Sequence, residues 1–571
     1  MYIIVALFFL AFATAHHEPP VTVNTAYGAV QGRILTSKIR SVPYAAFTGI
    51  PFAQPPVGVL RFKPPVRIQP WQGVFNASVE GTPCIQVSPF DGNTLIGSED
   101  CLYLNVFTPQ TKFQARRQST RSASTARPVM VWIYGGGFTS GYADHSVFGP
   151  DFIIEEDVLL VTFNYRLGAL GFMSLNVFNA TGNAGLKDQN LALQWVQENI
   201  RFFGGDPARV TIFGQSAGGA SVDTHILSEK SRGLFSGAIT MSASILNPWA
   251  FHRIDEAVSK AFSLARELRL YRPSIFNFNR RVELREEILR KLMDVPARDI
   301  VLATEKLSLA DPPFRPTIEY PEFARKEDIF LSDCPLRIFT SGNFAKVPFM
   351  LGFTSDETAF FGGVGNVLFD MFRAIPNTQM VPILDDILPP FLTDIINLPS
   401  MVISDLSTEV LRQLVNDTSE VHFISGIDQK ERLLHELSPE PVFYYRFTVD
   451  TEDSAHRVLY NVSLDGAAHS DDLPYIFYVS AKDLSRNASP RVRYVRDRIV
   501  SMWTNFAKFR NPTPKGAAIE VSWPEVGDKG NQLQIDEPLL VTDRAISRRV
   551  EMIIRANGRN NQVCRSASSL L

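Results

Sequence analysis

The stretch Val210-Thr211-Ile212-Phe213-Gly214-Gln215-Ser216-Ala217-Gly218-Gly219-Ala220 decides the fold of this chain. β-favouring residues lead into Gly-x-Ser-x-Gly and small residues follow, so the stretch predicts a strand, a tight turn and a helix. The turn strains the backbone of Ser216, and only small neighbours allow such close packing. We therefore expect its hydroxyl at the tip of a strand, beside a helix N-terminus whose amides favour negative charge. An ordinary glycine turn is the alternative, since this short pattern also occurs by chance.

Strands and helices alternate on both sides of this stretch. Buried strands are predicted over residues 129–133, 158–164, 237–241, 347–352 and 442–449, and helices over 188–202 and 490–508. A turn is expected at Gly204-Gly205-Asp206-Pro207. This alternation predicts an α/β fold: a large, mostly parallel central sheet with helices on both faces. Ligands bind where the strands of such a sheet end.

The remaining segments are expected at the edge of this sheet, over its faces or at the surface. Residues 22–80 hold short β-like runs and many prolines, which predicts an antiparallel edge followed by an irregular loop. Residues 250–340 and 360–440 are interpreted as helical insertions, and the second could line a substrate gorge. Residues 111–127 are polar and basic, so we expect a solvated surface insertion, with a polybasic binding role as the alternative.

Composition narrows the class of function. Of the 571 residues, 45% are hydrophobic, which is ample for a large core, and a net charge of −3 argues against a nucleic-acid surface. A metal site is not expected, because the sequence has neither CxxC nor HExxH.

The N-terminus indicates secretion. Residues 1–15 form an apolar run that ends in Ala13-Thr14-Ala15, which predicts a signal peptide cleaved before His16; a signal anchor is the alternative. No other run is long and apolar enough to span a bilayer, and the C-terminus carries neither a retention signal nor a hydrophobic tail. We expect residues 16–571 to form a single secreted domain without a membrane anchor.

Cysteines and glycosylation sequons fit that compartment. Cys84 and Cys101 close the shortest loop and are the expected disulfide, whereas Cys334 and Cys564 could be free or paired. Asn-x-Ser/Thr sequons occur at Asn76, Asn179, Asn416, Asn461 and Asn487.

A serine hydroxyl needs a base, and the base needs a carboxylate to fix its tautomer. Three histidines downstream of Ser216 are candidates. His225 lies on the helix just after the serine turn, too close in sequence to reach back to the serine, and is expected to be packed and hydrogen-bonded. His456 is expected in a charged loop. His469 follows small residues after a strand, which is the expected position of the base. Asp356 and Glu357 both follow a strand end and could act as the acid, or could instead cap the next helix.

A glycine run supplies candidate oxyanion donors. Tyr134-Gly135-Gly136-Gly137-Phe138 directly follows a predicted strand, and consecutive glycines let backbone N–H groups turn toward one point. A flexible turn or phosphate loop is the alternative, although the Gly-Lys-Ser/Thr of a Walker sequence is absent.

Two longer motifs carry a family resemblance. The segment from Phe203-Gly204-Gly205 to Gly214-Gln215-Ser216-Ala217-Gly218, and Glu99-Asp100-Cys101-Leu102-Tyr103-Leu104-Asn105-Val106, resemble signatures of the type-B carboxylesterase/cholinesterase family. The resemblance covers nearly the whole mature chain and implies an α/β-hydrolase that needs no cofactor. It implies Ser216 as nucleophile, Glu357 as acid and His469 as base, with oxyanion donors at Gly136, Gly137 and Ala217. It also implies the Cys84–Cys101 disulfide, while the cysteines of the family's second loop have no match.

Within that family the chain resembles the arthropod juvenile hormone esterases. Gln215 stands where most relatives carry glutamate, and no tryptophan lies between Cys84 and Cys101, which disfavours a cholinesterase. The resemblance implies hydrolysis of the methyl ester of a sesquiterpenoid, that is, a small apolar ester substrate. Alternatives are a broad detoxifying or dietary carboxylesterase and a non-catalytic, neuroligin-like adhesion protein. The oligomeric state stays open.

Overall fold

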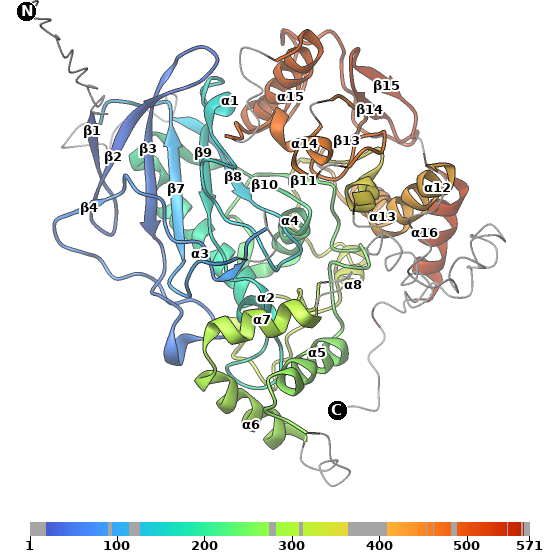
Figure 1. Ribbon diagram of the computed structural model, residues 1–571. Coiled ribbons are helices and arrows are strands. Elements are labelled where there is room, and N and C mark those ends of the chain that lie inside the picture. Colours follow the sequence, from blue (N-terminus) through green and yellow to red (C-terminus); the bar gives the residue numbers. More distant parts are fainter. Residues whose placement is uncertain are drawn as a thin grey trace, which may run out of the picture.

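A computed structural model describes residues 19–89, 94–113, 126–272, 281–307, 312–363, 408–452, 454–460, 462–480, 488–544, 546–560 and 564. Their main feature is a 13-stranded sheet with the order β1-β2-β3-β7-β9-β8-β10-β11-β12-β13-β14-β15, in which β4 also pairs with β2. In Figure 1 this sheet runs from the blue N-terminal strands on the left to the red C-terminal strands on the right.

The N-terminal part of the sheet is antiparallel, as predicted, apart from the parallel pairing of β4 with β2. It consists of β1 (Pro20–Asn24), β2 (Ala29–Thr36), β3 (Pro43–Pro51), β4 (Val74–Asn76) and β7 (Tyr103–Thr108). A separate two-stranded sheet contains β5 (Gln86–Val87) and β6 (Leu95–Ile96).

The central strands pair in parallel, which confirms the predicted sheet. They are β9 (Leu159–Phe163), β8 (Arg127–Ile133), β10 (Gly205–Gln215), β11 (Gly237–Met241), β12 (Phe349–Thr354), β13 (Val442–Phe447) and β14 (Gln532–Ile535), with β15 (Leu540–Thr542) antiparallel at the edge. Every residue of β9, β11 and β12 is buried, because both faces of a parallel sheet are covered.

The turn expected at residues 204–207 is wrong. Gly205 already pairs with Arg127 as the first residue of β10, and the register shifts before Val210. Pro207 cannot donate to a ladder, so an irregular start of the strand takes the place of a separate turn.

Helices cover both faces of the sheet, as alternate residues of β10 show. The hydroxyl of Thr211 accepts a hydrogen bond from Arg510, which caps the C-terminus of α15 (Pro490–Phe509). Gly214 lies three positions further on and therefore faces the other side, where it contacts Gly218 of α4 (Ala217–Leu227). The helices of the central fold also include α1 (Asp151–Ile154), α2 (Gly168–Phe172), α3 (Ala184–Asn199), α14 (Ala455–Tyr460) and the single turns η1 (Gly58–Leu60), η3 (Ile200–Phe203), η4 (Glu229–Ser231) and η12 (Leu473–Tyr475).

Two helical insertions interrupt the strand order. The first, between β11 and β12, lies at the bottom of Figure 1 and confirms the helices expected over 250–340. It contains α5 (Ile254–Glu267), α6 (Arg281–Asp294), α7 (Ala297–Leu307), η6 (Lys326–Asp328) and α8 (Pro335–Thr340). The second contains η7 (Glu357–Gly363), α12 (Thr408–Ser419), the π-helical η11 (Glu420–Ile424) and α13 (Ser425–Leu437). The remainder of the predicted gorge segment lies outside the described residues.

Both cysteine pairs form disulfides. Cys84 bonds to Cys101, and Cys334 bonds to Cys564 across 230 residues of sequence. The second bond, which the sequence left open, lies beyond the C-terminal helix α16 (Arg548–Asn560). Arg549 of this helix makes ion pairs with Asp417 and Glu420, so α16 is also tied to the second insertion.

The signal peptide and most of the basic stretch, residues 114–125, lie outside the described residues. Sequons at Asn76, Asn179 and Asn416 are exposed, whereas Asn461 and Asn487 are not among the described positions. In the part of the chain that the structure describes, no helix has both the length and the apolar character needed to cross a bilayer.

Candidate active site

Ser216 occupies a strained turn between β10 and α4. Its φ of 57° and ψ of −130° are unusual for a residue with a side chain, and its amide donates to the carbonyl of Met241 at 3.0 Å. A Cβ on Gly218 would lie 2.0 Å from the carbonyl oxygen of Ile133, so only glycine lets α4 pack this closely on β8. Ala217 is the first helical residue, and its amide belongs to the first turn, which has no acceptor within the helix.

The glycine run lies directly against this turn. A Cβ on Gly135 would lie 2.8 Å from Cβ of Ser216, so the loop after β8 touches the serine. Gly136 and Gly137 have φ values of 109° and 61°, which turn this backbone away from the strand direction. The glycine loop and the serine turn thus lie against each other at Gly135.

His469 and Glu357 form a close buried pair. Nδ1 of His469 lies 2.5 Å from Oε2 of Glu357, and the amide of His469 donates to the carbonyl of Glu357 at 3.0 Å. The second carboxylate oxygen accepts from the amide of Thr354 at 2.9 Å, which fixes the acid at the end of β12. With Nδ1 donating to the carboxylate, Nε2 carries the lone pair that a general base requires.

The order of the strands explains how distant residues meet. Ser216 follows β10, Glu357 is the third residue after the end of β12, and the segment with His469 follows β13. β10, β11, β12 and β13 are consecutive and parallel, so their carboxyl ends lie at the same edge of the sheet.

The other acid and base candidates are occupied elsewhere. The carboxylate of Asp356 accepts from the hydroxyl of Ser355 at 2.6 Å, and burial raises its pKa. His225 is packed and hydrogen-bonded, as predicted: its ring contacts Ser231 at 2.8 Å and Gln189 at 3.0 Å. Burial lowers the pKa of His225 to about 3, so this imidazole stays neutral.

The charged loop expected around His456 is wrong. His456 lies in the first turn of α14 and is buried, with Nδ1 2.6 Å from Asp471 and Nε2 3.0 Å from the carbonyl of Leu464. The imidazole is buried because both ring nitrogens have partners there.

Aromatic and amide groups complete the surroundings of His469. The ring of Phe423, from η11, lies 4.8 Å from the imidazole, and Trp249 packs on Phe423 at 5.5 Å. Gln215, the residue before the serine, places its side-chain amide nitrogen 3.0 Å from Nε2 of His469. The sequence singled out Gln215 for its missing charge, but its rotamer, and hence this contact, could not be predicted.

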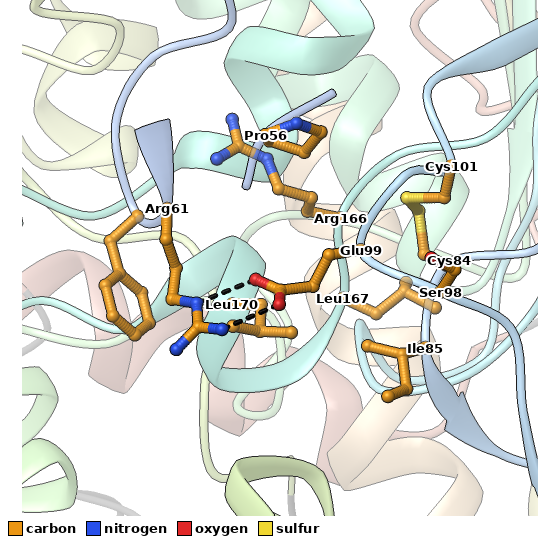
Figure 2. A pocket seen from close by; sticks show the side chains of 11 residues that line it. Pro56, Arg61, Cys84, Ile85, Ser98, Glu99, Cys101, Arg166, Leu167 and Leu170 are labelled. Carbon is orange, nitrogen blue, oxygen red and sulfur yellow. Dashed lines mark hydrogen bonds and ion pairs between the residues drawn. A yellow bond between two sulfur atoms is a disulfide. The ribbon is translucent and has the colours of Figure 1, made fainter. Parts of the chain in front are cut away.

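Arg61 forms a structural ion pair with Glu99. Its guanidinium binds both carboxylate oxygens of Glu99, at 2.7 and 2.6 Å, and the carbonyl of Val295 at 2.7 Å. Figure 2 shows this pair in the lining of a small pocket beside the Cys84–Cys101 disulfide. Its bonds tie the N-terminal loop to the first insertion.

Among the described residues, one trio has metal-ligand chemistry. Ligand atoms of Glu80, Asp144 and His145 lie within 4.8 Å of one another. Nδ1 of His145 is 2.7 Å from Glu80, however, and the pKa of His145 is raised by that hydrogen bond. The trio is satisfied as an ion pair, and no other observation points to a ligand.

Asp472 is a buried acid behind the histidine. Burial, reinforced by the carboxylates of Glu357 and Asp471, raises its pKa to about 8. Between its ordinary value of 3.8 and this value, the folded protein holds a proton that the unfolded chain has released. Stability contributed by this group is therefore complete below the ordinary value and is lost as the pH rises toward 8.

Asp472→Asn should flatten that pH dependence, because asparagine keeps the shape and never ionises. The variant should gain thermal stability relative to the natural protein as the pH rises from about 5 to about 8. Melting temperatures across this range measure the effect, and Asp528→Asn, whose side chain is fully exposed, is the control. Parallel curves for the natural protein and Asp472→Asn would contradict the prediction.

This mostly parallel sheet, with a strained serine, an acid and a histidine at its carboxyl edge, defines an α/β-hydrolase. Residues 19–552 match the carboxylesterase family. The chain belongs to that family and is a carboxylic ester hydrolase, as the resemblance predicted. Juvenile hormone esterase from Tribolium castaneum is 34% identical over 525 residues, covering 86% of this chain and 84% of that protein.

Relatives with other names have a similar sequence identity to this chain. Cocaine esterase from Oryctolagus cuniculus is 30% identical over 548 residues, covering 92% of this chain and 94% of that protein. Among solved structures, juvenile hormone esterase from Manduca sexta with OTFP covalently attached has a TM-score of 0.78 and 28% identity, covering 95% of this chain and 99% of that chain. The comparisons therefore give the family and the reaction class, and they leave the substrate open.

Proposed function

We propose that Ser216 is the nucleophile, His469 the general base and Glu357 the acid that orients it. The observation that carries this proposal is the 2.5 Å contact between Nδ1 of His469 and Oε2 of Glu357, which orients the imidazole at the edge of the sheet where the serine lies. The amides of Gly136, Gly137 and Ala217 are the proposed oxyanion donors.

The reaction proceeds by acyl transfer. Ser216 attacks the ester carbonyl while His469 accepts the hydroxyl proton, and Glu357 stabilises the resulting imidazolium. The three amides stabilise the charge on the tetrahedral oxygen. His469 then donates its proton to the departing alcohol. Water releases the acid from Ser216 by the same path, and the enzyme returns to its starting state.

For the substrate, we propose the methyl ester of a juvenile hormone-like sesquiterpenoid. Two relatives named juvenile hormone esterase, at 34% and 30% identity, support it, as does Gln215. The aromatic pair Phe423 and Trp249 beside His469 suits an apolar acyl group. Esterase B1 from Culex pipiens, at 33% identity, and cocaine esterase support the broad carboxylesterase instead.

We also propose that residues 1–15 are removed and that residues 16–571 are secreted as one catalytic domain. Two disulfides support an oxidising compartment. Exposed sequons at Asn76, Asn179 and Asn416 are accessible for glycans, and Asn461 and Asn487 are proposed as further sites.

A comparison of kcat/KM for two esters tests the substrate. A juvenoid methyl ester should be hydrolysed about tenfold or more efficiently than 1-naphthyl acetate, because the apolar rings of Phe423 and Trp249 then contribute to transition-state binding. The ethyl ester of the same juvenoid is the matched control for the alcohol group. Equal or reversed efficiencies for the methyl and naphthyl esters would favour the broad carboxylesterase.

A further inference from the structure

Gln215 is buried between the turn at Ser216 and the segment that carries His469. Its side chain belongs to a residue that is 2% exposed, and its Nε2 donates to the hydroxyl of Ser470 at 2.9 Å while lying 3.0 Å from Nε2 of His469. Its carbonyl oxygen Oε1 points to the glycine loop, since a Cβ on Gly135 would lie 2.9 Å from it. The amide therefore has a fixed orientation, with its nitrogen toward the imidazole.

The chemistry of the two nitrogens decides what this contact means. An amide NH₂ only donates, so Nε2 of His469 must accept, and it accepts only when it carries no proton. On the other side of the ring, Glu357 accepts from Nδ1 at 2.5 Å. Glu357 and Gln215 thus select the same tautomer from opposite sides.

We propose that Gln215 is a positioning residue that holds the resting His469 in the neutral form with its proton on Nδ1, until the hydroxyl of Ser216 replaces the amide at the lone pair of Nε2. This inference rests on the proposed function of His469 as the general base. It assigns to Gln215 a role in the reaction beyond the charge that it lacks.

The hydrogen bond also changes during the reaction. Once Nε2 of His469 has taken the serine proton, the NH₂ of Gln215 faces an N–H, and the contact becomes unfavourable. The neutral imidazole is thereby favoured over the imidazolium, which assists return of the proton to the departing alcohol. A carboxylate at this position would do the opposite, because it accepts from the protonated nitrogen.

Other groups near the imidazole do not replace this contact. Glu357 binds the opposite nitrogen, Asp472 lies buried behind the pair, and Asp471 is bonded to His456. Asp356 is bonded to Ser355, and from η11 the imidazole meets the uncharged ring of Phe423. Of the described neighbours, Gln215 is the group with a recorded contact to Nε2.

The pH dependence of kcat/KM for 1-naphthyl acetate tests the inference in Gln215→Met and Gln215→Glu. Both variants should move the acidic limb of the profile to higher pH, by about half a pH unit for methionine, which removes one hydrogen bond. For glutamate the move should exceed about one unit, because the carboxylate stabilises the imidazolium. The imidazole is neutral on the alkaline plateau in all three enzymes, so the position of the acidic limb, rather than the plateau value of kcat/KM, reports the inference.

Gln189→Met is the matched control. Gln189 contacts another buried imidazole, but in the opposite direction: its carbonyl oxygen Oε1 accepts from Nε2 of His225 at 3.0 Å. Its loss should lower the melting temperature and leave the acidic limb in place. A structural role alone for Gln215 would give the same pattern in Gln215→Met.

Each outcome decides. Profiles of both variants that superimpose on the natural one, or that move to lower pH, overturn the inference. If Gln215→Glu does not fold, as its melting curve would show, the shift in Gln215→Met decides alone. If the Ser216→Ala variant hydrolysed the ester at the rate of the natural enzyme, that result would refute the proposed function instead. The two failures are therefore distinguishable.

Discussion

Replacing Ser216 with alanine is expected to abolish ester hydrolysis while the protein stays folded. The loss in kcat should be on the order of 10⁶-fold, as when the nucleophile of another serine hydrolase is removed. Alanine keeps the Cβ and therefore the same backbone strain at φ 57°, and the amide bond to Met241 is unaffected. Initial rates on 1-naphthyl acetate and a melting curve measure the two halves of this prediction.

A matched serine provides the control. Ser263 lies on α5, where its hydroxyl donates to the carbonyl of Ser259 and accepts from Arg266 of the same helix, so Ser263→Ala should hydrolyse the ester normally. Mass spectrometry after treatment with an organophosphate should place the label on Ser216 in the natural enzyme and find none in Ser216→Ala. Labelling of Ser216 also separates an esterase from a non-catalytic adhesion protein. Hydrolysis that persists in Ser216→Ala would refute the assignment.

Replacing Lys430 with methionine is expected to cause the largest loss of stability. Lys430 of α13 is completely buried, and its ammonium binds Asp223 at 2.9 and 3.0 Å, the hydroxyl of Thr240 at 2.8 Å and the carbonyl of Ala243 at 3.0 Å. Burial lowers the pKa of Lys430 and raises the pKa of Asp223, and the attraction between the two opposes both changes. Removing the lysine leaves a buried carboxylate without its counter-charge.

The expected cost is about 3–5 kcal/mol of the free energy of unfolding. It should be measured by guanidinium denaturation and compared with Lys291→Met, which breaks the exposed Lys291–Glu287 pair. That control should cost less than about 1 kcal/mol. Replacing Asp223 with leucine as well should recover part of the loss, since the uncompensated charge is then gone. A Lys430→Met variant as stable as the control would show that the pair does not contribute.

The loss of Lys430 should also affect the backbone at the active site. The same carboxylate of Asp223 accepts from the amide of Ile245 at 2.9 Å, in the loop that follows β11. The last residue of β11, Met241, supplies the carbonyl that holds the amide of Ser216. Lys430 therefore connects the second insertion to the backbone behind the nucleophile.

The apolar runs of the sequence predicted the fold because they are clearest in the central, buried strands of the sheet. Residues 237–241 are apolar or small apart from Thr240, are completely buried, and form β11 over the same five positions that were predicted. The sequence prediction was wrong where turn-forming residues pair with a neighbouring strand. Around Pro207, residues typical of a turn form the start of β10. Chain-order arguments placed Ser216, Glu357 and His469 after three strands, and the parallel order of those strands brings them to one edge.

The contacts that sequence could not supply depend on rotamers and on distant pairing. The amide of Gln215 reaches His469 across 254 positions, and Lys430 reaches Asp223 across 207. His456, which was expected in a charged loop, lies in α14 and is buried with its Nδ1 against Asp471. The pairing of Cys334 with Cys564 follows only from where α16 ends.

That second disulfide changes what a broken peptide bond would do. Residues 334 and 564 enclose the segment that carries Glu357, Lys430 and His469. A protease that cut the backbone once anywhere inside this covalent ring would produce two polypeptides that remain one molecule, with the acid and the base still attached to the serine half. Only cleavage together with reduction would let the pieces diffuse apart, so a nicked enzyme can keep its parts in an environment rich in proteases.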